Sequence, residues 1–416
     1  MTVSIVLITG NHLCHNPRAI KEASALAKAG REVLVLGAWT DASLQARDKA
    51  LVVGMPFAFV PVVDATDGAL RARMLRLLRR IRGRAASMAH RLLGIESRAQ
   101  FGQAVGGLLR AAERTPATLY IAHSEAGLHV ASALAAGGAT VAVDMEDWYS
   151  EDLLPEARSA RPTRRLRRLE RELLQRAAYS SCPSESMSRA LALEYACPAP
   201  TVIYNAFSWQ ERELLDGRAE DRRGRTVPSI HWYSQTLGPG RGLEDLVTGL
   251  RDVRAAAELH LRGALAAGFE AWLWDRAPDA WRERIFIQPL VPNDQLLSRI
   301  AEHDVGFAGE RSDIRSRDLT VTNKVLHYLL GGLAVVASDT AGQREVAGLA
   351  PNAVRLYPGG NAAALAAELN RLLDSPAQLA AGKAAALRAA AATFCWEKQE
   401  GRLVEAADRA LAAAKG

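Results

Sequence analysis

The chain has 416 residues, of which 49% are hydrophobic and 24% charged, and its formal net charge is +6. This length exceeds what one ordinary core holds and the composition is that of a globular protein, so we expect two domains and exclude a disordered chain. No apolar run reaches the ~18 residues of a membrane span, and the short apolar run near the N-terminus has no basic residues before it, so we expect no signal peptide.

The four cysteines stand far apart in the sequence, at Cys14, Cys182, Cys197 and Cys395. No Cys-x-x-Cys pair occurs, so we expect neither a zinc knot nor a framework of disulfides. Unpaired cysteines fit a reducing compartment, which predicts a cytoplasmic protein.

Apolar runs and helical patterns alternate in the first half of the chain. Continuous apolar runs are typical of strands buried on both faces, and they predict strands over 3–9, 32–38, 57–63, 118–124, 140–146 and 178–184. Between the first two strands, Pro17 marks a helix start and Gly30 marks its end. This alternation predicts an α/β fold with a doubly wound sheet.

The alternation stops over 206–228, a polar and charged segment that we interpret as a linker. It then resumes, with strands predicted over 229–234, 257–263, 285–290, 304–310 and 333–339 and a helix over 323–330. We therefore predict an N-terminal domain over 1–205, a C-terminal domain over 229–390 and a final helix over 391–416. Because ligands bind at the carboxyl ends of strands in such sheets, we expect the active site in a cleft between the two domains.

Three glycines follow the strand expected over 229–234, at Gly238, Gly240 and Gly242. They let the backbone approach a ligand closely, the helix start after them favours an anion, and Arg241 adds a fixed charge. One interpretation is a cradle for a diphosphate, and the other is a tight turn with a solvated arginine. The pattern is neither a Walker A loop nor a full dinucleotide fingerprint.

Asn323 and Lys324 open the helix expected over 323–330. A lysine at the N-terminal end of a helix opposes the helix dipole. Binding of a phosphate would offset this cost, whereas the alternative is a solvated lysine. Because both basic sites follow strands in the same half of the chain, we favour a pair that binds phosphate.

The C-terminal half resembles the nucleotide-sugar domain of retaining GT-B glycosyltransferases, glycosyltransferase family 4 and its relatives, in the segments QTLGPGRGLEDL, FIQPLVPNDQLLSRIAEHDVGFA and NKVLHYLLGGLAVVASDTAGQREV. The N-terminal half resembles that family's acceptor domain in ITGNHLCHNPRAIKEASALAKAGREVLVL, IAHSEAGLHVA and VDMEDWYSED. The resemblance covers nearly the whole chain. It implies a GT-B fold, in which two Rossmann-like doubly wound domains face each other across a cleft and a C-terminal helix returns toward the N-terminal domain.

The resemblance also implies roles for individual residues. Arg241 and Lys324 match the basic pair that grips the donor diphosphate, and His123 matches a histidine near the acceptor or the sugar, so we take these three as catalytic. The residues expected to bind the donor include neighbours of Arg241 and Lys324 in the sequence. The full set is Gly10, Asn11, Gly238, Gly240, Val291, Pro292, Glu310, Thr322, Asn323, His327 and Glu345. The residues expected on the acceptor side are His12, Asp144, Glu146 and Asp147.

The chain departs from the common family pattern at one pair of positions. Many relatives carry two glutamates there, and the aligned residues in this chain are Leu319 and His327. The paired carboxylates are therefore absent, although relatives whose helix starts with Asn-Lys also exist. We hypothesise that Glu310 supplies one carboxylate, the alternative being an ordinary surface glutamate.

Two groups of residues could indicate a metal site: His12 and His15 around Cys14, and the acidic loop 144–147. We interpret the first as a polar loop lining the cleft, because no other ligand set accompanies it. The resemblance implies that basic side chains and a helix end do the work of a metal in GT-B enzymes. We expect no metal and no other cofactor.

The resemblance predicts an enzyme that moves a sugar, with retention, from a nucleoside-diphosphate sugar of the UDP or GDP type to a hydroxyl of a glycan or lipid-linked acceptor. The setting it implies is bacterial-type synthesis of surface polysaccharide or glycolipid. One alternative is a GT-B nucleotide-sugar epimerase, although the C-terminal half is poor in the carboxylates that such an enzyme needs. The other is a non-catalytic GT-B scaffold of a polysaccharide assembly, against which Arg241 and Lys324 argue.

Arginines are concentrated between Arg71 and Arg91, where eight of them occur without one acidic residue. Leucine, isoleucine and methionine recur between them at helical spacing, which predicts a basic amphipathic helix over 70–95 and an anionic membrane surface as its partner. The alternative is a solvated helix that packs on its own domain. Nucleic acid is not expected, because the block has almost no aromatic residues for base stacking. We expect a cytoplasmic protein that attaches peripherally to the inner face of the cell membrane.

Overall fold

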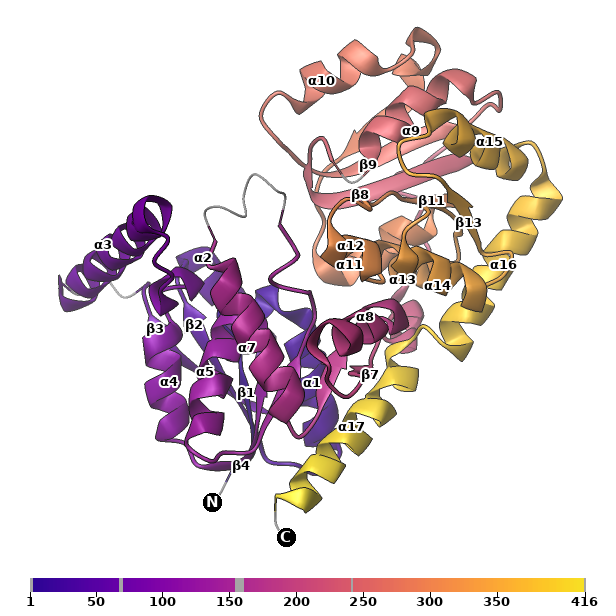
Figure 1. Cartoon of the computed structure of the whole chain (residues 1–416). Helices are drawn as coiled ribbons and strands as arrows, with labels where there is room; N and C mark the ends of the chain where they lie inside the picture. The colour runs from indigo at the N-terminus through magenta and orange to yellow at the C-terminus, as the bar shows by residue number, and fades with distance from the viewer. Residues whose placement is uncertain (1–2, 67–69, 154–160, 241, 415–416) are drawn as a thin grey trace. The chain divides into compact units, whose positions relative to one another are not determined.

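The computed structural model describes residues 3–66, 70–153, 161–240 and 242–414 (Figure 1). By the contacts within the chain, these residues form two compact units. Unit 1 comprises Met1–Ile203 with Glu400–Gly416, and unit 2 comprises Tyr204–Gln399.

Unit 1 is built on a seven-stranded parallel sheet in the order β3-β2-β1-β4-β5-β6-β7. Its strands are β1 (Val3–Ile8), β2 (Val33–Trp39), β3 (Ala58–Asp64), β4 (Ala117–Ala122), β5 (Val141–Asp144), β6 (Ser180–Cys182) and β7 (Thr201–Val202). The first six lie where the apolar runs predicted them, because continuous apolar runs suit strands that are buried on both faces. The two-residue strand β7 is too short to leave such a run.

Helices alternate with the strands of unit 1 along the chain. They are η1 (Leu13–His15), α1 (Pro17–Lys28), α2 (Ala42–Leu51), α3 (Leu70–Leu93), η2 (Arg98–Phe101), α4 (Val105–Glu113), α5 (Ser124–Ala136), α7 (Thr163–Arg176) and α8 (Glu185–Tyr195). The helix expected at Pro17 is confirmed: the Asn16 side chain caps it by accepting from the Ala19 backbone N–H at 3.0 Å. It is followed by Gly30, whose φ of +82° suits a residue without Cβ.

Unit 2 contains a second parallel sheet, with six strands in the order β10-β9-β8-β11-β12-β13. The strands are β8 (Ser229–Leu237), β9 (Glu258–Leu265), β10 (Ile285–Gln288), β11 (Val305–Ala308), β12 (Ala334–Ser338) and β13 (Val354–Tyr357). Five of them were predicted, and β8 continues three residues further than its apolar run. The strand β13 was missed because its sequence VRLY carries a charged residue and is short.

The helices that follow in the chain are η3 (Trp209–Leu214), α9 (Leu243–Gly249), η4 (Leu250–Asp252), α10 (Phe269–Arg276), η5 (Asp279–Arg284), α11 (Asn293–Ala301), α12 (Arg315–Leu319), α13 (Asn323–Gly331), α14 (Ala341–Leu349), α15 (Ala362–Leu373), α16 (Pro376–Ala392) and α17 (Trp396–Ala413). Most of α17 belongs to unit 1. Among the described residues, no helix has both the length and the hydropathy that crossing a bilayer requires.

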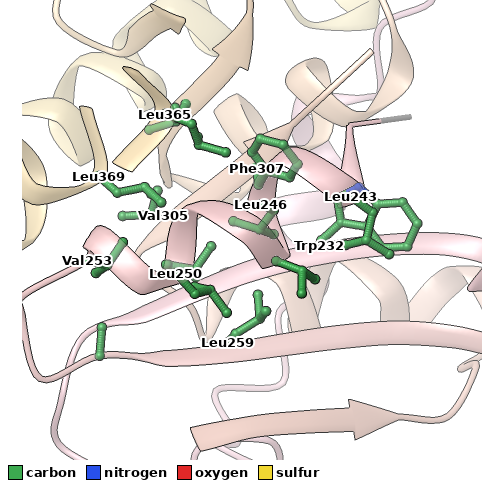
Figure 2. Close-up of a cluster of buried hydrophobic side chains, with 14 of the residues drawn as sticks. Trp232, Leu243, Leu246, Leu250, Val253, Leu259, Val305, Phe307, Leu365 and Leu369 are labelled. Atoms are coloured by element: carbon green, nitrogen blue, oxygen red, sulfur yellow. The ribbon is translucent and has the colours of Figure 1, made fainter. Parts of the chain in front are cut away.

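The core of unit 2 fixes α9 on one face of the sheet (Figure 2). Leu246 and Leu250 are fully buried there, together with Leu259 of β9 and Phe307 of β11. Burial of one such side chain stabilises a fold by roughly 1.5–3 kcal/mol. This packing holds in place the turn between β8 and α9, which contains the predicted glycines.

The polar segment 206–228 lies in unit 2, where its polar groups have partners. The Arg222 guanidinium pairs with Glu258 at 2.6 Å, and the Asp221 backbone N–H donates to Glu302 at 2.7 Å. We interpreted this polar segment as a linker. In the structure, its polar residues form hydrogen bonds and ion pairs with other residues of unit 2.

Candidate functional site

The helix α13 positions Lys324 inside unit 2. Every residue from Lys324 to Gly331 is buried, as expected for a helix that is apolar on all sides. Gly332 ends the helix with a φ of +77° and so allows the chain to enter β12 directly.

Lys324 pairs with Glu310, which directly follows Gly309 after β11. The lysine is 5% exposed and Glu310 is 8% exposed, and Lys324 Nζ lies 3.1 Å from Glu310 Oε1. The ammonium is also 5.4 Å from the centre of the Trp232 ring, within range of a cation–π contact. The alternative of a solvated Lys324 is therefore wrong. Lys324 is a buried positive charge that Glu310 holds in place.

Glu310 is held in place by hydrogen bonds that join three elements. Its backbone N–H donates to Ser338 Oγ at 2.7 Å, at the end of β12. Gln343 of α14 donates to Ser338 Oγ at 3.2 Å and to the Ala308 carbonyl at 2.7 Å. Glu310 is thus a preorganised buried group, which contradicts its reading as a surface glutamate.

The glycine turn lies beside this pair. Gly240 and Gly242 have φ values of +98° and +75°, and a Cβ on Gly242 would stand 2.9 Å from the Cα of Gly309, next to Glu310. Only glycine fits so close an approach. Gly238 opens the same turn, while Arg241 lies outside the described residues, so its role in binding phosphate stays a prediction.

The order of the strands explains why the turn and the ion pair meet. β8 and β11 are neighbours in the sheet although β9 and β10 separate them in sequence, so the chain reverses its winding direction between them. Such a reversal leaves a crevice at the carboxyl ends of the two strands, where open α/β sheets bind their ligands. Gly238 follows β8 and Glu310 follows β11, at this point of the sheet.

His327 lies one turn further along α13 and has two aromatic neighbours. Its ring stacks on Phe207 with 3.3 Å between centroids, and its Nδ1 is 2.7 Å from the Tyr233 hydroxyl. Burial raises the pKa of Tyr233. The sequence analysis placed His327 at the family's glutamate position but missed Phe207 and Tyr233, because the contacts between them and His327 are remote in sequence.

The first residues of α13 leave polar groups at the helix start. Thr322 occupies the N-cap without a side-chain cap bond, and its buried Oγ1 has no hydrogen-bond partner in the described part of the chain. Asn323 is exposed. The backbone N–H groups of a helix start favour an anion, which is consistent with the expected position of a phosphate.

The remaining expected donor-binding residues lie on two other helices. Glu345 of α14 accepts a hydrogen bond from the Tyr204 hydroxyl at 2.7 Å. Val291 is half-buried and Pro292 is exposed at the N-cap of α11, directly before the helix and after β10. These three residues lie on elements separate from the Lys324–Glu310 pair, and their roles in donor binding stay predictions.

In unit 1, His123 and Asp144 belong to a fully buried cluster with Arg18 and Glu22. The guanidinium of Arg18 donates to both carboxylate oxygens of Asp144, at 2.6 and 2.7 Å. His123 Nε2 lies 3.3 Å from Glu22 and His123 Nδ1 lies 3.4 Å from Asp144. Burial alone would lower the pKa of His123, but the two carboxylates outweigh it and raise that pKa to about 10.

This cluster resembles a metal site in one respect. One ligand atom each of Glu22, His123 and Asp144 lies within 4.8 Å of the others, the only such set found among the described residues. However, the Arg18 guanidinium already supplies a positive charge there and also donates to the Ile203 carbonyl at 2.7 Å. The cluster is therefore built as an ion-pair network, with its cation provided by the chain itself.

His12 uses both ring nitrogens inside unit 1. Its Nε2 accepts from the backbone N–H groups of Thr40 and Asp41, at 2.8 and 3.0 Å, which leaves Nδ1 to donate to Asp48 at 3.0 Å. Asp48 also accepts from the Cys14 backbone N–H at 2.7 Å. We expected His12 on the acceptor side, and the structure gives it the function of tying the loop after β1 to α2.

The loop after β1 also contacts the start of α5. The Gly10 backbone N–H donates to Ser124 Oγ at 3.1 Å, and Ser124 has a φ of +66°, which is unusual for a residue other than glycine. The Ser124 backbone N–H donates in turn to the Tyr149 hydroxyl at 3.1 Å. Asn11, next to Gly10, is exposed.

Glu146 and Asp147 are half-buried in the loop that follows β5. Burial, together with the charge of Asp144, raises the pKa of Glu146. The structure therefore brings the predicted Gly10, His123 and Asp144 to the ends of the neighbouring strands β1, β4 and β5, with Arg18, Glu22, Ser124 and Tyr149 as partners that the sequence analysis missed.

Neither a family model nor a curated relative matches the chain by sequence. Solved structures do match. Sucrose-phosphate synthase from Thermosynechococcus elongatus is similar over 99% of this chain and all of its own, with a TM-score of 0.70 at 14% identity. HepE from Anabaena, solved in complex with UDP-glucose, is similar over 97% of this chain and 98% of its own, with a TM-score of 0.68 at 14% identity.

A third similar structure is named for a different reaction. A Listeria monocytogenes protein, provisionally identified as a UDP-N-acetylglucosamine 2-epimerase, is similar over the whole of this chain and 96% of its own, with a TM-score of 0.58 at 13% identity. Likenesses at such identities show the fold and leave the reaction open. The chain therefore has two Rossmann-like parallel sheets of seven and six strands and shares the GT-B fold of its glycosyltransferase neighbours, as predicted.

Proposed function

We propose that the protein is a retaining glycosyltransferase that moves a sugar from a UDP- or GDP-sugar to a hydroxyl of a glycan or lipid-linked acceptor. The observation that carries the proposal is the buried Lys324–Glu310 pair beside the glycine turn, at the switch point of the unit 2 sheet. The UDP-glucose complex of the structurally similar HepE supports the choice of a nucleoside-diphosphate sugar.

Departure of the nucleoside diphosphate generates negative charge at the phosphate oxygens. Lys324 is positioned to stabilise that charge because it is already desolvated and fixed, so no reorganisation is needed when the bond breaks. Arg241 and the N–H groups at the start of α13 complete the expected anion site. In this proposal the leaving phosphate accepts the proton of the incoming hydroxyl, and no side chain acts as a nucleophile.

Glu310 has two functions in this proposal. Before the donor binds, it compensates the charge of Lys324, which would otherwise be costly to bury. When a diphosphate takes over Lys324, the carboxylate becomes available as an acceptor for a sugar hydroxyl. The Tyr233–His327 hydrogen bond offers a second polar contact for the sugar, in place of the glutamate that many relatives carry at His327.

His123 acts in this proposal through the buried cluster of unit 1. Its charged ring, between Glu22 and Asp144, fixes the ends of β4 and β5, and Glu146 and Asp147 in the loop after β5 are thereby positioned toward the acceptor. Transfer proceeds without a metal, because fixed cations of the chain neutralise the diphosphate. Undiminished turnover after exhaustive treatment with EDTA is the expected result.

An epimerase is the second candidate, favoured by the similarity to the Listeria structure. Incubation of the enzyme with a nucleotide sugar and no acceptor separates the two reactions. A transferase releases at most slow hydrolysis products, whereas an epimerase produces a new nucleotide sugar.

The proposed setting is the synthesis of a surface polysaccharide or glycolipid on the inner face of a bacterial-type membrane. It follows from the expected lipid-linked acceptor and from the basic helix α3. Radiolabelled transfer to extracted lipid acceptors, compared with transfer to soluble glycans, tests this part.

A thermal-shift screen with UDP-, GDP-, ADP- and CDP-sugars tests the donor site. A ligand at a hundred times its Kd stabilises a protein by about 2.7 kcal/mol, which corresponds to a rise in Tm of about 5 °C or more. One UDP- or GDP-sugar should produce such a rise. No response to any nucleotide sugar would contradict the proposal and would favour a non-catalytic scaffold.

A further inference from the structure

The helix α3 has a row of large apolar side chains in solvent. Their spacing of three, four, seven and four residues places them on one face of the helix. These residues, which we call the α3 stripe, are Met74, Leu77, Ile81, Met88 and Leu92, with Leu78 beside them, and each is between 53% and 75% exposed. Apolar side chains are often exposed singly, but a continuous row on one helix face indicates a surface with a partner.

The apolar face of α3 faces solvent, whereas a helix that packs on its own domain turns its apolar face inward. α3 packs chiefly against η2, and Figure 1 shows it standing away from the sheet of unit 1. Among the side chains of α3 whose burial the structure describes, Ala86, Ser87 and Ala89 are half-buried, while the large apolar ones are exposed. A solvated helix packed on its own domain would bury the large side chains instead.

The charge around the stripe has a single sign. The 24 residues of α3 include eight arginines and no acidic residue. Arg80, Arg82, Arg84 and Arg91 are exposed and border the stripe on both sides at helical spacing. A partner must therefore offer an apolar layer and negative charge together.

A second group of arginines adjoins the C-terminal end of α3. The backbone N–H groups of Arg164 and Arg165, at the start of α7, donate to the Glu96 carboxylate at 3.1 and 2.6 Å. The Arg164 side chain also donates to the Gly94 carbonyl at 2.7 Å. These bonds join the start of α7, which carries the exposed Arg167 and Arg168, to the segment that directly follows α3.

We propose that the α3 stripe docks into the surface of an anionic lipid bilayer, with α3 lying in the membrane plane and its arginines against the headgroups. A bilayer supplies both an apolar layer and negative charge along the roughly 36 Å that a helix of 24 residues spans. A second copy of the chain would bring arginines against arginines. Nucleic acid offers no apolar layer, and the stripe has no aromatic side chain on which bases could stack.

Sedimentation of the full chain with vesicles tests this proposal, and it needs neither a sugar donor nor turnover. Vesicles of phosphatidylcholine with phosphatidylglycerol are compared with vesicles of phosphatidylcholine alone, at 50 to 500 mM salt. Binding should require the anionic lipid and weaken with salt, since surface charge is screened. Each arginine removed, as in Arg82→Ser and Arg84→Ser, should weaken partitioning about fivefold.

The apolar part is tested by the double variant Ile81→Ser/Met88→Ser. Loss of two inserted side chains should weaken partitioning by at least about a hundredfold. Leu193→Ser is the matched control, because Leu193 of α8 is 87% exposed and lies outside the stripe. Ile81→Trp gives an independent readout: its fluorescence should shift to the blue only with anionic vesicles.

Three results would overturn the proposal. The first is absence of binding to anionic vesicles at low salt, and the second is equal binding by the double variant and the control. The third is a dimer of the wild-type chain that Ile81→Ser/Met88→Ser dissociates while vesicles do not compete, which would assign the stripe to a second copy. Because none of these results depends on glycosyl transfer, failure here leaves the proposed transfer reaction untouched and bears only on its membrane setting.

Discussion

Lys324 and Glu310 form a buried ion pair, with 3.1 Å between Nζ and Oε1, at the point where the glycine turn of unit 2 passes Gly309. The lysine begins a helix that is apolar on all sides, so its charge enters a desolvated environment. An ion pair of this kind contributes little net stability, because desolvation offsets the attraction between the charges. Its presence at the carboxyl ends of β8 and β11 is better explained by a ligand that uses the charge.

The first prediction separates the stability of this pair from its function. Lys324→Met leaves a carboxylate buried without its cation, which should lower the free energy of unfolding by about 3–5 kcal/mol. The double variant Lys324→Met/Glu310→Gln removes both charges and should recover most of this loss. Urea unfolding of the two variants checks the expectation; equal destabilisation of both would contradict it.

The second prediction concerns the Tyr233 hydroxyl, 2.7 Å from His327 Nδ1. Tyr233→Phe removes one hydrogen bond and should cost about 1 kcal/mol of stability. If this contact orients the donor sugar, kcat/KM should fall more than the loss of stability explains. Tyr120→Phe in unit 1 is the control away from the site: its hydroxyl donates to the Thr115 carbonyl at 2.9 Å and accepts from the Ala117 backbone N–H at 3.1 Å. Similar kinetics of both variants would remove Tyr233 from sugar recognition.

The third prediction concerns acid stability. His231, His260 and His303 lie together in unit 2: His231 stacks on His303 with 4.5 Å between ring centroids, and His260 is tilted against His303 with 4.7 Å between them. Burial, with the charge of His303, lowers the pKa of His260 to about 4. The unfolded chain takes up a proton near pH 6.5 while the folded one does not, so the stability from this group is full above pH 6.5 and is lost between pH 6.5 and about 4.

His231→Phe tests this expectation. The His231 ring nitrogens have no hydrogen-bond partner within the described ranges, so the change removes a protonation site without breaking a bond. Burial lowers the pKa of His231 as well. The acid-unfolding midpoint of the variant should therefore move to lower pH, whereas the exposed control His15→Gln should leave it unchanged. An unchanged midpoint in His231→Phe would show that the stack does not govern acid unfolding.

The fourth prediction concerns alkaline stability and unit 1. The pKa of His123 is raised to about 10, so the folded state keeps a proton that the unfolded state releases near pH 6.5. This contribution is full below pH 6.5 and disappears as the pH rises toward about 10. The unfolding free energy of His123→Gln should consequently vary less with pH across this interval than that of the wild type. Parallel curves would mean that His123 is neutral in the folded protein.

Most of the fold could be predicted because parallel strands buried on both faces leave long apolar runs, as in VSIVLIT of β1. The two short strands β7 and β13 left none. In the candidate site, Lys324 stood out because a lysine contradicts both the helix dipole and the apolar pattern around it. Arg18 and Glu22 did not stand out in the sequence, because on α1 they resemble the solvated polar face of an ordinary amphipathic helix.

The other site residues could not be predicted, because they are brought together by contacts between positions that are remote in sequence. Tyr233 lies 94 positions from His327, and Asp48 lies 36 positions from His12. No local pattern indicates such partners. His123 was assigned to the acceptor or the sugar because it matches a histidine of the family that the chain resembles, but its place at the end of a strand also suits a buried histidine whose charge is compensated by carboxylates from neighbouring elements.

The central claim is that unit 2 binds a nucleoside diphosphate through Lys324. Isothermal titration calorimetry of UDP and GDP with the wild-type chain and with Lys324→Met/Glu310→Gln tests it most directly, because the double variant removes the cation without leaving a buried unpaired carboxylate. We predict that one nucleotide binds the wild type and that the double variant binds it about 10- to 100-fold more weakly, as expected for the loss of a hydrogen bond to a charged group. Equal affinity of both proteins, or no binding of either nucleotide to the wild type, would contradict the account.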